Sequence, residues 1–355
     1  MNDSKAKAGS PGISERALDI ERHEELLGYL RGEGILPPGD RPAIRTMAGG
    51  VSNRTVLVES PARGAFVVKQ ALAQLRVAAE WFADPERIHR EARALECLAG
   101  LAPPGTVTRL LFEDRRQHVI GMTAVPEPHR NWKQMLLAGR VCLEHVTGFA
   151  ALLGAIHSKS SLDPTLARGE LADRSFFESL RLEPYYLYSG RQVPEARLFF
   201  DRLIEETRAT RLALVHGDYS PKNILIRDQH LVLLDHEVAH FGDPAFDVGF
   251  SLTHLLSKSL HVTSCRGELL NAARTYVATY LGCLEGTGWR DALEPRAVRH
   301  TLGCLLARVA GRSPLEYLTP PERQKQAKMV LKLMALPPLR LGELIDAYAE
   351  ELDCR

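Results

Sequence analysis

The strongest constraint on the fold of this chain is the stretch LVHGDYSPKNILIRDQHLVLLDHEVAHFGDPAFDVGF, which runs from Leu214 to Phe250. Polar side chains follow short apolar runs in it: Asp218 comes after the first run, and Asn223 stands five residues later. Two further apolar runs follow, and Asp235 stands at the end of the second, twelve residues beyond Asn223. Because those two runs have the pattern of a strand, a turn and a strand, we expect the two carboxylates and the amide to converge at one edge of a small hairpin.

This combination of oxygen groups fits phosphoryl transfer. In that chemistry a protein orients an attacking hydroxyl and holds a divalent cation against nucleotide phosphates, without forming covalent bonds itself. Carboxylate and amide oxygens are the ligands that Mg²⁺ prefers. The spacing also matches the catalytic loop and the metal-binding aspartate of protein kinases. Each residue alone would be an ordinary turn residue, so the prediction depends on the combined spacing.

The region before this stretch has the pattern of an antiparallel sheet with one main helix. Short β-like runs begin at Arg41, and the pair Gly49-Gly50 forms a turn between two of them. The next segment has the start and stop signals of a helix, with Asp84 as its N-cap and Gly100 at its end. Together these signals predict a sheet that is accompanied by a single long helix.

Two prolines in the segment AVPEPH, at positions 126 and 128, end the β-like pattern, and the chain beyond them has a largely helical pattern. Its last periodic run predicts one helix over 322–350. A length of 355 residues favours one large two-lobed unit. We therefore predict an α+β fold with an N-terminal antiparallel β-sheet lobe and a larger, mostly helical C-terminal lobe. The predicted parts are a flexible N-terminus (1–21), an N-terminal nucleotide-binding lobe (22–125) and a C-terminal catalytic and substrate-binding lobe (126–355).

A lysine and a glutamate in the N-terminal lobe form a second signal. Lys69 ends the strand-like run FVVK, and Glu91 lies on the apolar row of the predicted helix. An unpaired carboxylate in a buried row would be costly, so the two side chains are expected to form an ion pair.

The motif HGDxxxxN, here His216-Gly217-Asp218 to Asn223, resembles that of the aminoglycoside phosphotransferase and choline kinase family, small-molecule relatives of the protein kinases. The resemblance extends from about residue 41 to the C-terminal helices. It implies a bilobal protein-kinase-like fold and transfer of the γ-phosphoryl group of ATP to a small-molecule hydroxyl. It also implies that Asp218 is the catalytic base and that Asn223 and Asp235 bind Mg²⁺.

The same resemblance assigns roles in the N-terminal lobe. The lysine of such a pair holds the α and β phosphates and the glutamate orients it. The glycine turn would cover the phosphates with backbone N–H groups, because glycine lets the backbone approach a ligand closely. The segment from Met122 to Pro126 would be the hinge that contacts adenine. The predicted nucleotide-binding residues are Lys69, Glu91, Gly49, Gly50, Ser52 and Asn53.

Within this family the methylthioribose kinases are the most similar group. The stretch KQALAQLRVAAEWFADPERIHREARAL resembles their segment after the nucleotide lysine, and DHEVAHFGDPAFDVG resembles their metal segment. The sequence departs from them at His236, where they have proline, and in the loop YSPKN. The part of the chain after residue 240 carries about 13 acidic and 14 basic side chains, so it lacks the acidic excess that a polycationic aminoglycoside would favour. Methylthioribose or another hydroxylated metabolite is therefore favoured over an aminoglycoside.

Three further residues are candidates for contact with the substrate. Arg308 and Arg312 fall where the methylthioribose kinases place a basic pair that reaches the substrate, although the two are not adjacent here. Glu237 stands two positions after Asp235, which puts both side chains on the same side of an extended chain. It could be a second metal contact, a substrate contact or a solvated acid.

The segment His236-Glu237-Val238-Ala239-His240 also has the zinc-protease pattern HExxH, which requires both histidines on one face of a helix. Here the pattern follows a strand directly and leads into Gly242-Asp243-Pro244, so no adequate helix is expected. These histidines are interpreted as loop residues that pack near the metal aspartate.

Two other classes of function compete with the small-molecule kinase. A nucleotide-binding regulator that has lost transfer activity would retain the same fold. A protein kinase is disfavoured by the missing arginine before Asp218 and by the absence of DFG and APE motifs.

The overall composition narrows the partners. A formal net charge of +1 provides no basic field for nucleic acid. No apolar run has the length of a membrane span, and the six cysteines form no CxxC pair. A reduced cytoplasmic protein with a small-molecule hydroxyl substrate is the resulting expectation. The oligomeric state is left open, a homodimer included.

Overall fold

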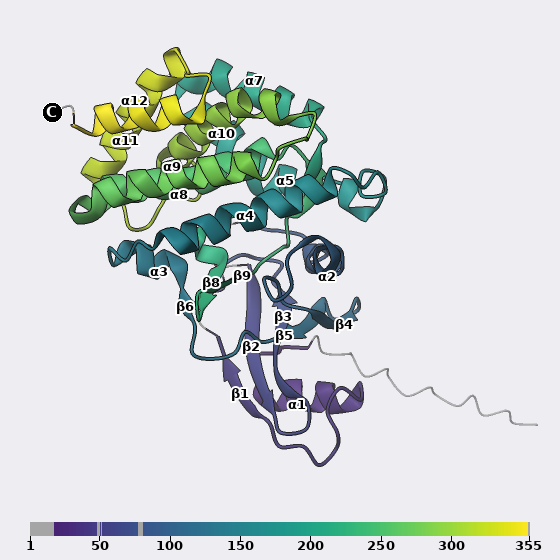
Figure 1. Cartoon of the computed structure of the whole chain (residues 1–355). Helices are drawn as coiled ribbons and strands as arrows, with labels where there is room; N and C mark the ends of the chain where they lie inside the picture. The colour runs from purple at the N-terminus through teal and green to yellow at the C-terminus, as the bar shows by residue number, and fades with distance from the viewer. Residues whose placement is uncertain (1–17, 48–49, 51, 77–80, 354–355) are drawn as a thin grey trace, which may run out of the picture.

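A computed structural model describes residues 18–47, 50, 52–76 and 81–353 of the chain. It has two lobes (Figure 1): the N-terminal segments form a sheet with two helices at the bottom of the view, and the later segments form a larger helical body above it. The predicted α+β fold is therefore confirmed.

The N-terminal lobe is built on a five-stranded antiparallel sheet with the strand order β1-β2-β3-β5-β4. Helix α1 packs on one face of this sheet and α2 on the other. The bounds are α1 (His23–Gly32), β1 (Ala43–Thr46), β2 (Asn53–Ser60), β3 (Gly64–Ala71), α2 (Arg87–Leu101), β4 (Leu110–Asp114) and β5 (Val119–Thr123).

The alternation of side chains along β3 decides which residues face the active site. Successive side chains of a strand point to opposite faces of the sheet. Val68 packs with Leu26 of α1, whereas Ala71 packs with Ile88 of α2. Lys69 has the same parity as Ala71, so it points to the face that α2 covers.

The start of the chain differs from the sequence prediction. Residues 1–17 of the predicted flexible N-terminus lie outside the described residues, but 18–21 pack against the sheet. Ile20 is fully buried, and its N–H donates to Gln70 Oε1 at 3.4 Å. The prediction of flexibility is therefore wrong for 18–21, because an apolar side chain there completes the core under α1.

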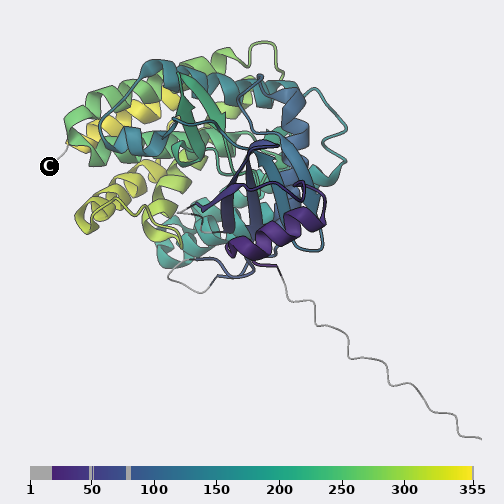
Figure 2. The same ribbon diagram turned by 90° about the horizontal axis from the view of Figure 1, so that it is seen from below.

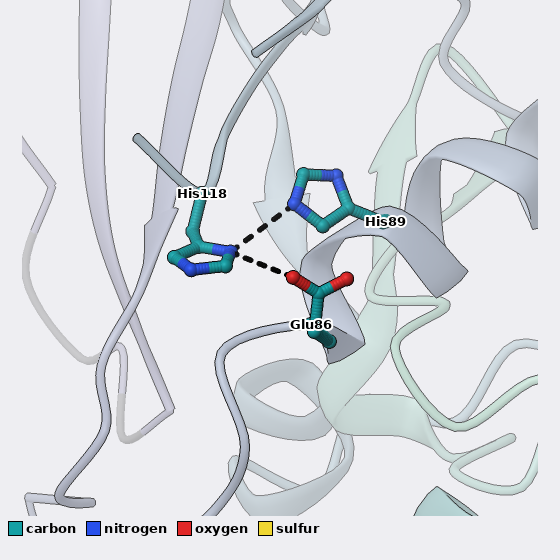
Figure 3. Close-up of side chains that lie close together, drawn as sticks. All are labelled: Glu86, His89 and His118. Atoms are coloured by element: carbon teal, nitrogen blue, oxygen red, sulfur yellow. Dashed lines mark hydrogen bonds and ion pairs between the residues drawn. The ribbon is translucent and has the colours of Figure 1, made fainter. Parts of the chain in front are cut away.

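The predicted helix of this lobe begins slightly later than expected. The first residue of α2 is Arg87 rather than Pro85, and a turn precedes it in which the Asp84 carboxylate accepts from the Glu86 N–H at 3.0 Å. The turn between β4 and β5 lies against this end of α2, where His118 stands beside His89 (Figure 3). The β4–β5 turn thus joins the sheet to the start of α2.

The C-terminal lobe is organised around α8 (Ala245–His261), which is buried along almost its whole length. Helices α9 (Arg266–Gly282) and α10 (Arg290–Ala310) pack against α8, and α4 (Leu143–Ser160) packs against α9. The predicted helix over 322–350 is two helices, α11 (Pro320–Ala335) and α12 (Leu341–Asp353). Prolines at 337 and 338 separate them, since proline cannot continue a helix interior.

Short strands in this lobe hold the loops that matter for function. β7 (Ala213–Val215) pairs with β10 (His240–Gly242), and β8 (Ile224–Arg227) lies between β6 (Arg130–Asn131) and β9 (His230–Leu233). The remaining elements are α3 (Trp132–Leu137), η1 (Glu170–Ala172), α5 (Ser175–Phe177), η2 (Glu178–Leu187), α6 (Tyr188–Gln192), η3 (Pro194–Ala196), α7 (Arg197–Ala209), η4 (Pro221–Asn223) and η5 (Thr263–Cys265). Figure 2, which views the molecule from below, shows the sheet lobe in front of the helical lobe. Within the described residues, none of the helices combines the length and apolar character needed to cross a bilayer.

Candidate active site

A buried aspartate fixes the loop that follows β7. Asp247, in the first turn of α8, accepts from the backbone N–H groups of His216 at 2.6 Å and Gly217 at 2.8 Å. Gly217 has a φ of +76°, and a Cβ there would lie 2.9 Å from Val238 Cγ2. Only glycine meets both conditions without strain. The loop therefore emerges from β7 in one conformation, which fixes the position of the residue that follows.

Asp218 and Asn223 are held together at the end of this loop. The amide nitrogen of Asn223 donates to Asp218 Oδ2 at 2.8 Å and to the backbone oxygen of Asp218 at 3.0 Å. Arg181 of η2 lies 3.3 Å from the same Oδ2. These contacts orient the Asn223 amide so that its oxygen faces away from Asp218. The predicted pair thus meets, with one carboxylate oxygen and one amide oxygen left for other partners.

Asp235 follows β9 in the left-handed region, with a φ of +68°. Its Oδ1 lies 3.0 Å from the Nζ of Lys69, which reaches it from the N-terminal lobe. Burial alone would raise the pKa of Asp235, but the ammonium groups of Lys69 and Lys222 outweigh that effect and hold the pKa below its usual range. Asp235 is therefore a carboxylate at neutral pH, which is the form that binds a cation.

The predicted pair of Lys69 and Glu91 is present. The Lys69 Nζ lies 2.8 Å from both carboxylate oxygens of Glu91, and the Glu91 side chain is fully buried. Burial raises the pKa of Glu91 to about 7, and Lys69 acts against that rise. Burial would lower the pKa of Lys69, but Asp235 and Glu91 together raise it. Lys69 is thus paired with two carboxylates, those of Glu91 and Asp235. One positive charge does not balance two negative ones, so the site can accept a further cation.

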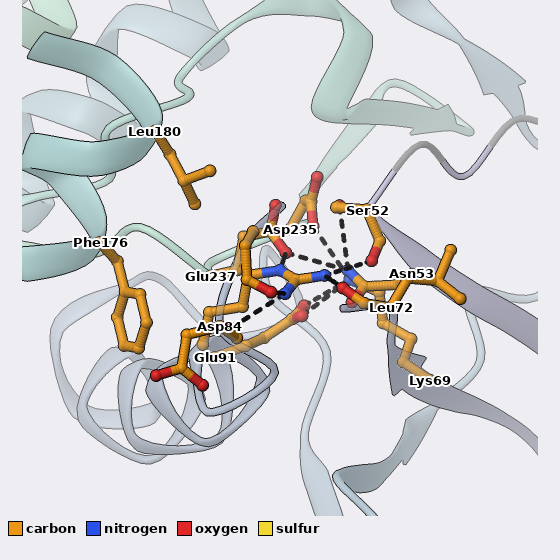
Figure 4. A network of polar contacts seen from close by, with 12 residues as sticks. Ser52, Asn53, Lys69, Leu72, Asp84, Glu91, Phe176, Leu180, Asp235 and Glu237 are labelled. Atoms are coloured by element: carbon orange, nitrogen blue, oxygen red, sulfur yellow. Dashed lines mark hydrogen bonds and ion pairs between the residues drawn. The ribbon is translucent and has the colours of Figure 1, made fainter. Parts of the chain in front are cut away.

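Glu237 is not a solvated acid, which was one of its three interpretations. The side chain is buried, and its Oε2 accepts from Arg87 Nε at 3.1 Å and from Asn53 Nδ2 at 3.1 Å. Figure 4 shows Glu237 and Asn53 converging with Lys69 and Asp235. Glu237 therefore stands beside Asp235 as a second acid, fixed by two donors from the N-terminal lobe.

Arg87 is a buried residue of this polar network that the sequence interpretation missed. Its side chain is fully buried and donates to four backbone oxygens besides Glu237, those of Ser52, Leu72, Ala83 and Asp84. A signal was present, because Arg87 precedes Glu91 by four residues and so lies on the same buried face of α2. A second charged residue on the buried face of a helix indicates an oppositely charged partner in another part of the chain.

A cavity of about 330 Å³ lies between the sheet and the segment that joins the lobes. Apolar side chains such as Leu57, Val67 and Leu234 line it, and Lys69 and Asp235 stand among its lining residues. The predicted hinge lines it too, from position 122 to position 126. The shape and lining suit a flat heterocycle with a charged tail that extends toward Lys69.

A second cavity, of about 140 Å³, shares Asp235 with the first. Asp218 and Glu237 line it together with Arg308 and His254. Arg308 donates to Tyr185 Oη at 3.2 Å and to Ser313 Oγ at 2.9 Å, but its Nε has no partner among the described residues. The Nε2 of His254, also buried, has none either. Arg308 and His254 thus stand in the wall of a cavity that contains the predicted base, and one nitrogen of each is buried without a partner among the described residues.

Arg312 is not brought into this cavity, contrary to the prediction. It pairs with Glu183 at 3.2 Å, and its guanidinium lies 5.2 Å from the ring centre of Tyr188. The helix α10 ends at Ala310, so the chain turns away between the two arginines. Of the predicted basic pair, only Arg308 lines the second cavity.

The predicted glycine turn is described only in part. Gly49 lies outside the described residues. A Cβ on Gly50 would lie 2.5 Å from the backbone oxygen of Asn53, so a side chain is excluded there. Ser52 lines the second cavity, and the Asn53 side chain is occupied by Glu237. Ser52 therefore stands at the second cavity, and the contact of the glycine turn with phosphates stays a prediction.

The HExxH segment carries no helix. His240 lies on β10 and His236 lies in the loop before it, both buried. The ring of His236 packs edge-on against His216, and the ring of His240 stacks on Phe177. His236 is a packing residue in a loop, as the sequence interpretation held, whereas His240 packs from strand β10 and not from a loop.

Comparisons with known proteins identify the family of this chain. A model of the phosphotransferase enzyme family matches residues 43–294. Methylthioribose kinase 1 of Oryza sativa subsp. japonica is 27% identical over 246 residues, which cover 61% of this chain and 56% of that protein. The methylthioribose kinase of Pectobacterium atrosepticum is 25% identical over 217 residues, 54% of this chain and 53% of that protein. The chain thus spans little more than half the length of these curated relatives.

Solved structures show the same fold. Amicoumacin kinase hAmiN, in complex with AMP-PNP, Ca²⁺ and Ami, superimposes with a TM-score of 0.56 at 13% identity, covering 91% of this chain and 99% of that one. Choline kinase from Cryptosporidium parvum Iowa II gives a TM-score of 0.53 at 12% identity, covering 91% of this chain and 99% of that one. At such identities the likeness concerns the fold alone, which is the bilobal kinase-like fold.

Proposed function

Because this chain belongs to the phosphotransferase enzyme family, we propose that it is a small-molecule kinase that transfers the γ-phosphoryl group of ATP to a hydroxyl group of its acceptor. The observation that carries the proposal is the convergence of Asp218, Asn223 and Asp235 beside the Lys69–Glu91 pair. Each of the five supplies one part that phosphoryl transfer requires, and they come from both lobes.

The donor set supports a nucleotide and Mg²⁺ as cofactors. Asp235 is held ionised, and Asn223 keeps its amide oxygen free because its nitrogen is used by Asp218. Glu237 supplies a further carboxylate beside Asp235. Hard oxygen ligands of this kind suit Mg²⁺, which when bound would neutralise phosphate charge. One neighbour of the same fold was solved with AMP-PNP and Ca²⁺.

We assign to Asp218 the role of the base that acts on the acceptor hydroxyl. Its contacts with Asn223 and Arg181 both use Oδ2, so Oδ1 stays available toward the second cavity that the residue lines. A carboxylate in that position orients the hydroxyl and takes its proton as the new bond to phosphorus forms. Lys69 holds the phosphates from the other side of the site.

The second cavity favours a neutral or anionic acceptor that is rich in oxygen. Burial, together with the nearby Lys258 and Arg308, holds the pKa of His254 well below its usual range, so its ring is neutral. Arg308, which lines the cavity, carries guanidinium donors that suit hydroxyl or carboxylate oxygens. The cavity wall carries three cations, Arg181, Lys222 and Arg308, and three carboxylates, Asp218, Asp235 and Glu237, so it has no acidic excess for a polycation. A sugar of the methylthioribose type fits this chemistry, and we propose that class over an aminoglycoside.

The proposal is tested by incubating the full chain and Mg-ATP with a polar metabolite extract, and separately with methylthioribose and with an aminoglycoside. Mass spectrometry is expected to find a species that gains one phosphoryl group, and methylthioribose is expected to be phosphorylated while the aminoglycoside is not. Failure of every acceptor to gain a phosphoryl group, while Mg-ATP still binds, would support the regulator without transfer activity.

Replacement of Arg308 tests the acceptor cavity. Arg308→Ala is expected to raise the KM for the acceptor roughly 10- to 100-fold, because a charged hydrogen-bond donor to the substrate contributes about 1.5–3 kcal/mol. The KM for ATP is expected to stay unchanged, since Arg308 does not line the first cavity. Steady-state kinetics with each substrate varied in turn measures both constants.

Arg312→Ala is the matched control, because that arginine lies four residues further on and outside the cavity. Its acceptor KM is expected to match that of the wild type. Equal effects of the two substitutions would remove Arg308 from the acceptor site.

A further inference from the structure

Two histidines and a glutamate meet on the N-terminal lobe, outside the cavities described above (Figure 3). Glu86 and His89 stand at the start of α2, and His118 ends the turn between β4 and β5. The Nδ1 of His118 lies 3.2 Å from the Nε2 of His89 and 3.6 Å from Glu86 Oε1. One nitrogen or oxygen from each residue thus falls within 4.8 Å of the other two.

A fourth residue fixes the orientation of His89. Its Nδ1 lies 2.6 Å from Glu113 Oε1, and the ring is only 4% exposed. A carboxylate only accepts hydrogen bonds, so the Nδ1 carries the hydrogen and the Nε2 presents a lone pair toward His118. A histidine whose second ring nitrogen donates to a carboxylate is the arrangement that usually supports a metal ligand.

The spacing of these atoms suits a tetrahedral cation. Bonds of about 2.0–2.1 Å to Zn²⁺ place two tetrahedral ligands roughly 3.3 Å apart. The observed separations of 3.2 Å and 3.6 Å lie on either side of that value. Two imidazole nitrogens and one carboxylate oxygen are a donor set for Zn²⁺ or a similar transition metal, whereas Mg²⁺ prefers oxygen donors alone.

The charges around the cluster are mixed. The positive end of α2 opposes a cation, and so does Arg115, which lies 3.4 Å from Glu113. The carboxylates of Glu86 and Glu113 act in the other direction. His118 has a φ of +48°, a left-handed conformation that histidine adopts more readily than most residues. The turn thus holds its histidine toward α2 in a backbone conformation that few side chains adopt.

We propose that Glu86, His89 and His118 bind a divalent transition-metal cation of the Zn²⁺ class, with water as the fourth ligand. The bound cation joins the β4–β5 turn to the first turn of α2. His89 and Glu91 are two residues apart, so they point to sides of the helix about 200° apart. The metal site therefore contacts one side of α2, and Glu91 pairs with Lys69 on the opposite side of the same helix.

Cobalt absorption tests the site directly, because tetrahedral Co²⁺ gives visible bands when nitrogen and carboxylate ligands bind it. The metal-free full chain is titrated with Co²⁺ in excess Mg²⁺, which occupies oxygen-only sites. One Co²⁺ per chain with tetrahedral bands is expected. His118→Asn is expected to abolish these bands at the same Co²⁺ concentration, because asparagine tolerates the left-handed conformation but is a poor ligand. Glu86→Gln is expected to weaken Co²⁺ binding at least 10-fold.

Two controls locate the metal. His230→Asn removes an exposed histidine from the β8–β9 hairpin, and the bands are expected to remain. Asp235→Asn removes one of the carboxylates between the lobes, and the bands are expected to remain in that variant too. Zn²⁺ is also expected to raise the melting temperature of the wild type but not of His118→Asn, since a ligand that binds only the folded state stabilises it. Absence of the bands in the wild type, or their persistence in His118→Asn, overturns the proposal.

Discussion

Asp218→Asn is expected to lower kcat by about 10²- to 10⁴-fold, the usual contribution of a general base, and to leave binding of Mg-ATP nearly unchanged. The substitution keeps the shape of the side chain. The amide oxygen of an asparagine can still accept from Asn223 and Arg181, so the loop is expected to keep its conformation. What is lost is the ability to take a proton from the acceptor hydroxyl.

The measurement has two parts, because loss of turnover alone does not identify a base. Single-turnover phosphoryl transfer gives the chemical rate, and calorimetric titration gives the affinity for Mg-ATP. Asp228→Asn is the matched control, since that aspartate is exposed in the nearby β8–β9 turn. Near-normal transfer by Asp218→Asn would refute the role of base, whereas loss of Mg-ATP binding would assign the residue to the nucleotide site.

The sequence predicted the polar core of the site well because local rules determine it. The spacing from Asp218 through Asn223 to Asp235 is a property of one loop and one hairpin, so neighbouring strands bring the three together. The pairing of Lys69 with Glu91 followed from the cost of a buried carboxylate. Neither inference required knowledge of how distant parts of the chain pack.

Contacts between distant segments were harder to predict. Arg87 lies on the buried face of α2, but its partner Glu237 is 150 residues away, and only the approach of the two lobes brings them together. Arg312 was placed in the acceptor site by analogy, and the end of α10 removes it. The packing of Ile20 depended on α1. The apolar residues of this helix, HEELLGYLRG, are few and stand among polar ones, so the sequence pattern did not indicate the helix.

Arg87→Met is expected to destabilise the protein by about 3–5 kcal/mol, which is the usual cost of leaving one charge of a buried ion pair without its partner. The Glu237 carboxylate would keep only its contact with Asn53, and four backbone oxygens would lose a donor. Glu237→Gln is expected to cost less, because the buried guanidinium keeps its backbone partners. Urea unfolding of both single variants and the double variant measures these free energies.

The double-mutant cycle isolates the pair from the effects of each substitution alone. A coupling free energy of about 1–3 kcal/mol is expected between Arg87 and Glu237, the range found for residues in one buried network. The control cycle uses Arg274 and Asp346, an exposed pair 2.6 Å apart, for which less than about 1 kcal/mol is expected. Because Arg87 belongs to the N-terminal lobe and Glu237 to the C-terminal lobe, a large coupling would mean that this pair fixes the lobes against each other. A coupling as small as that of the exposed pair would instead leave the contact between Lys69 and Asp235 as the main polar connection across the site.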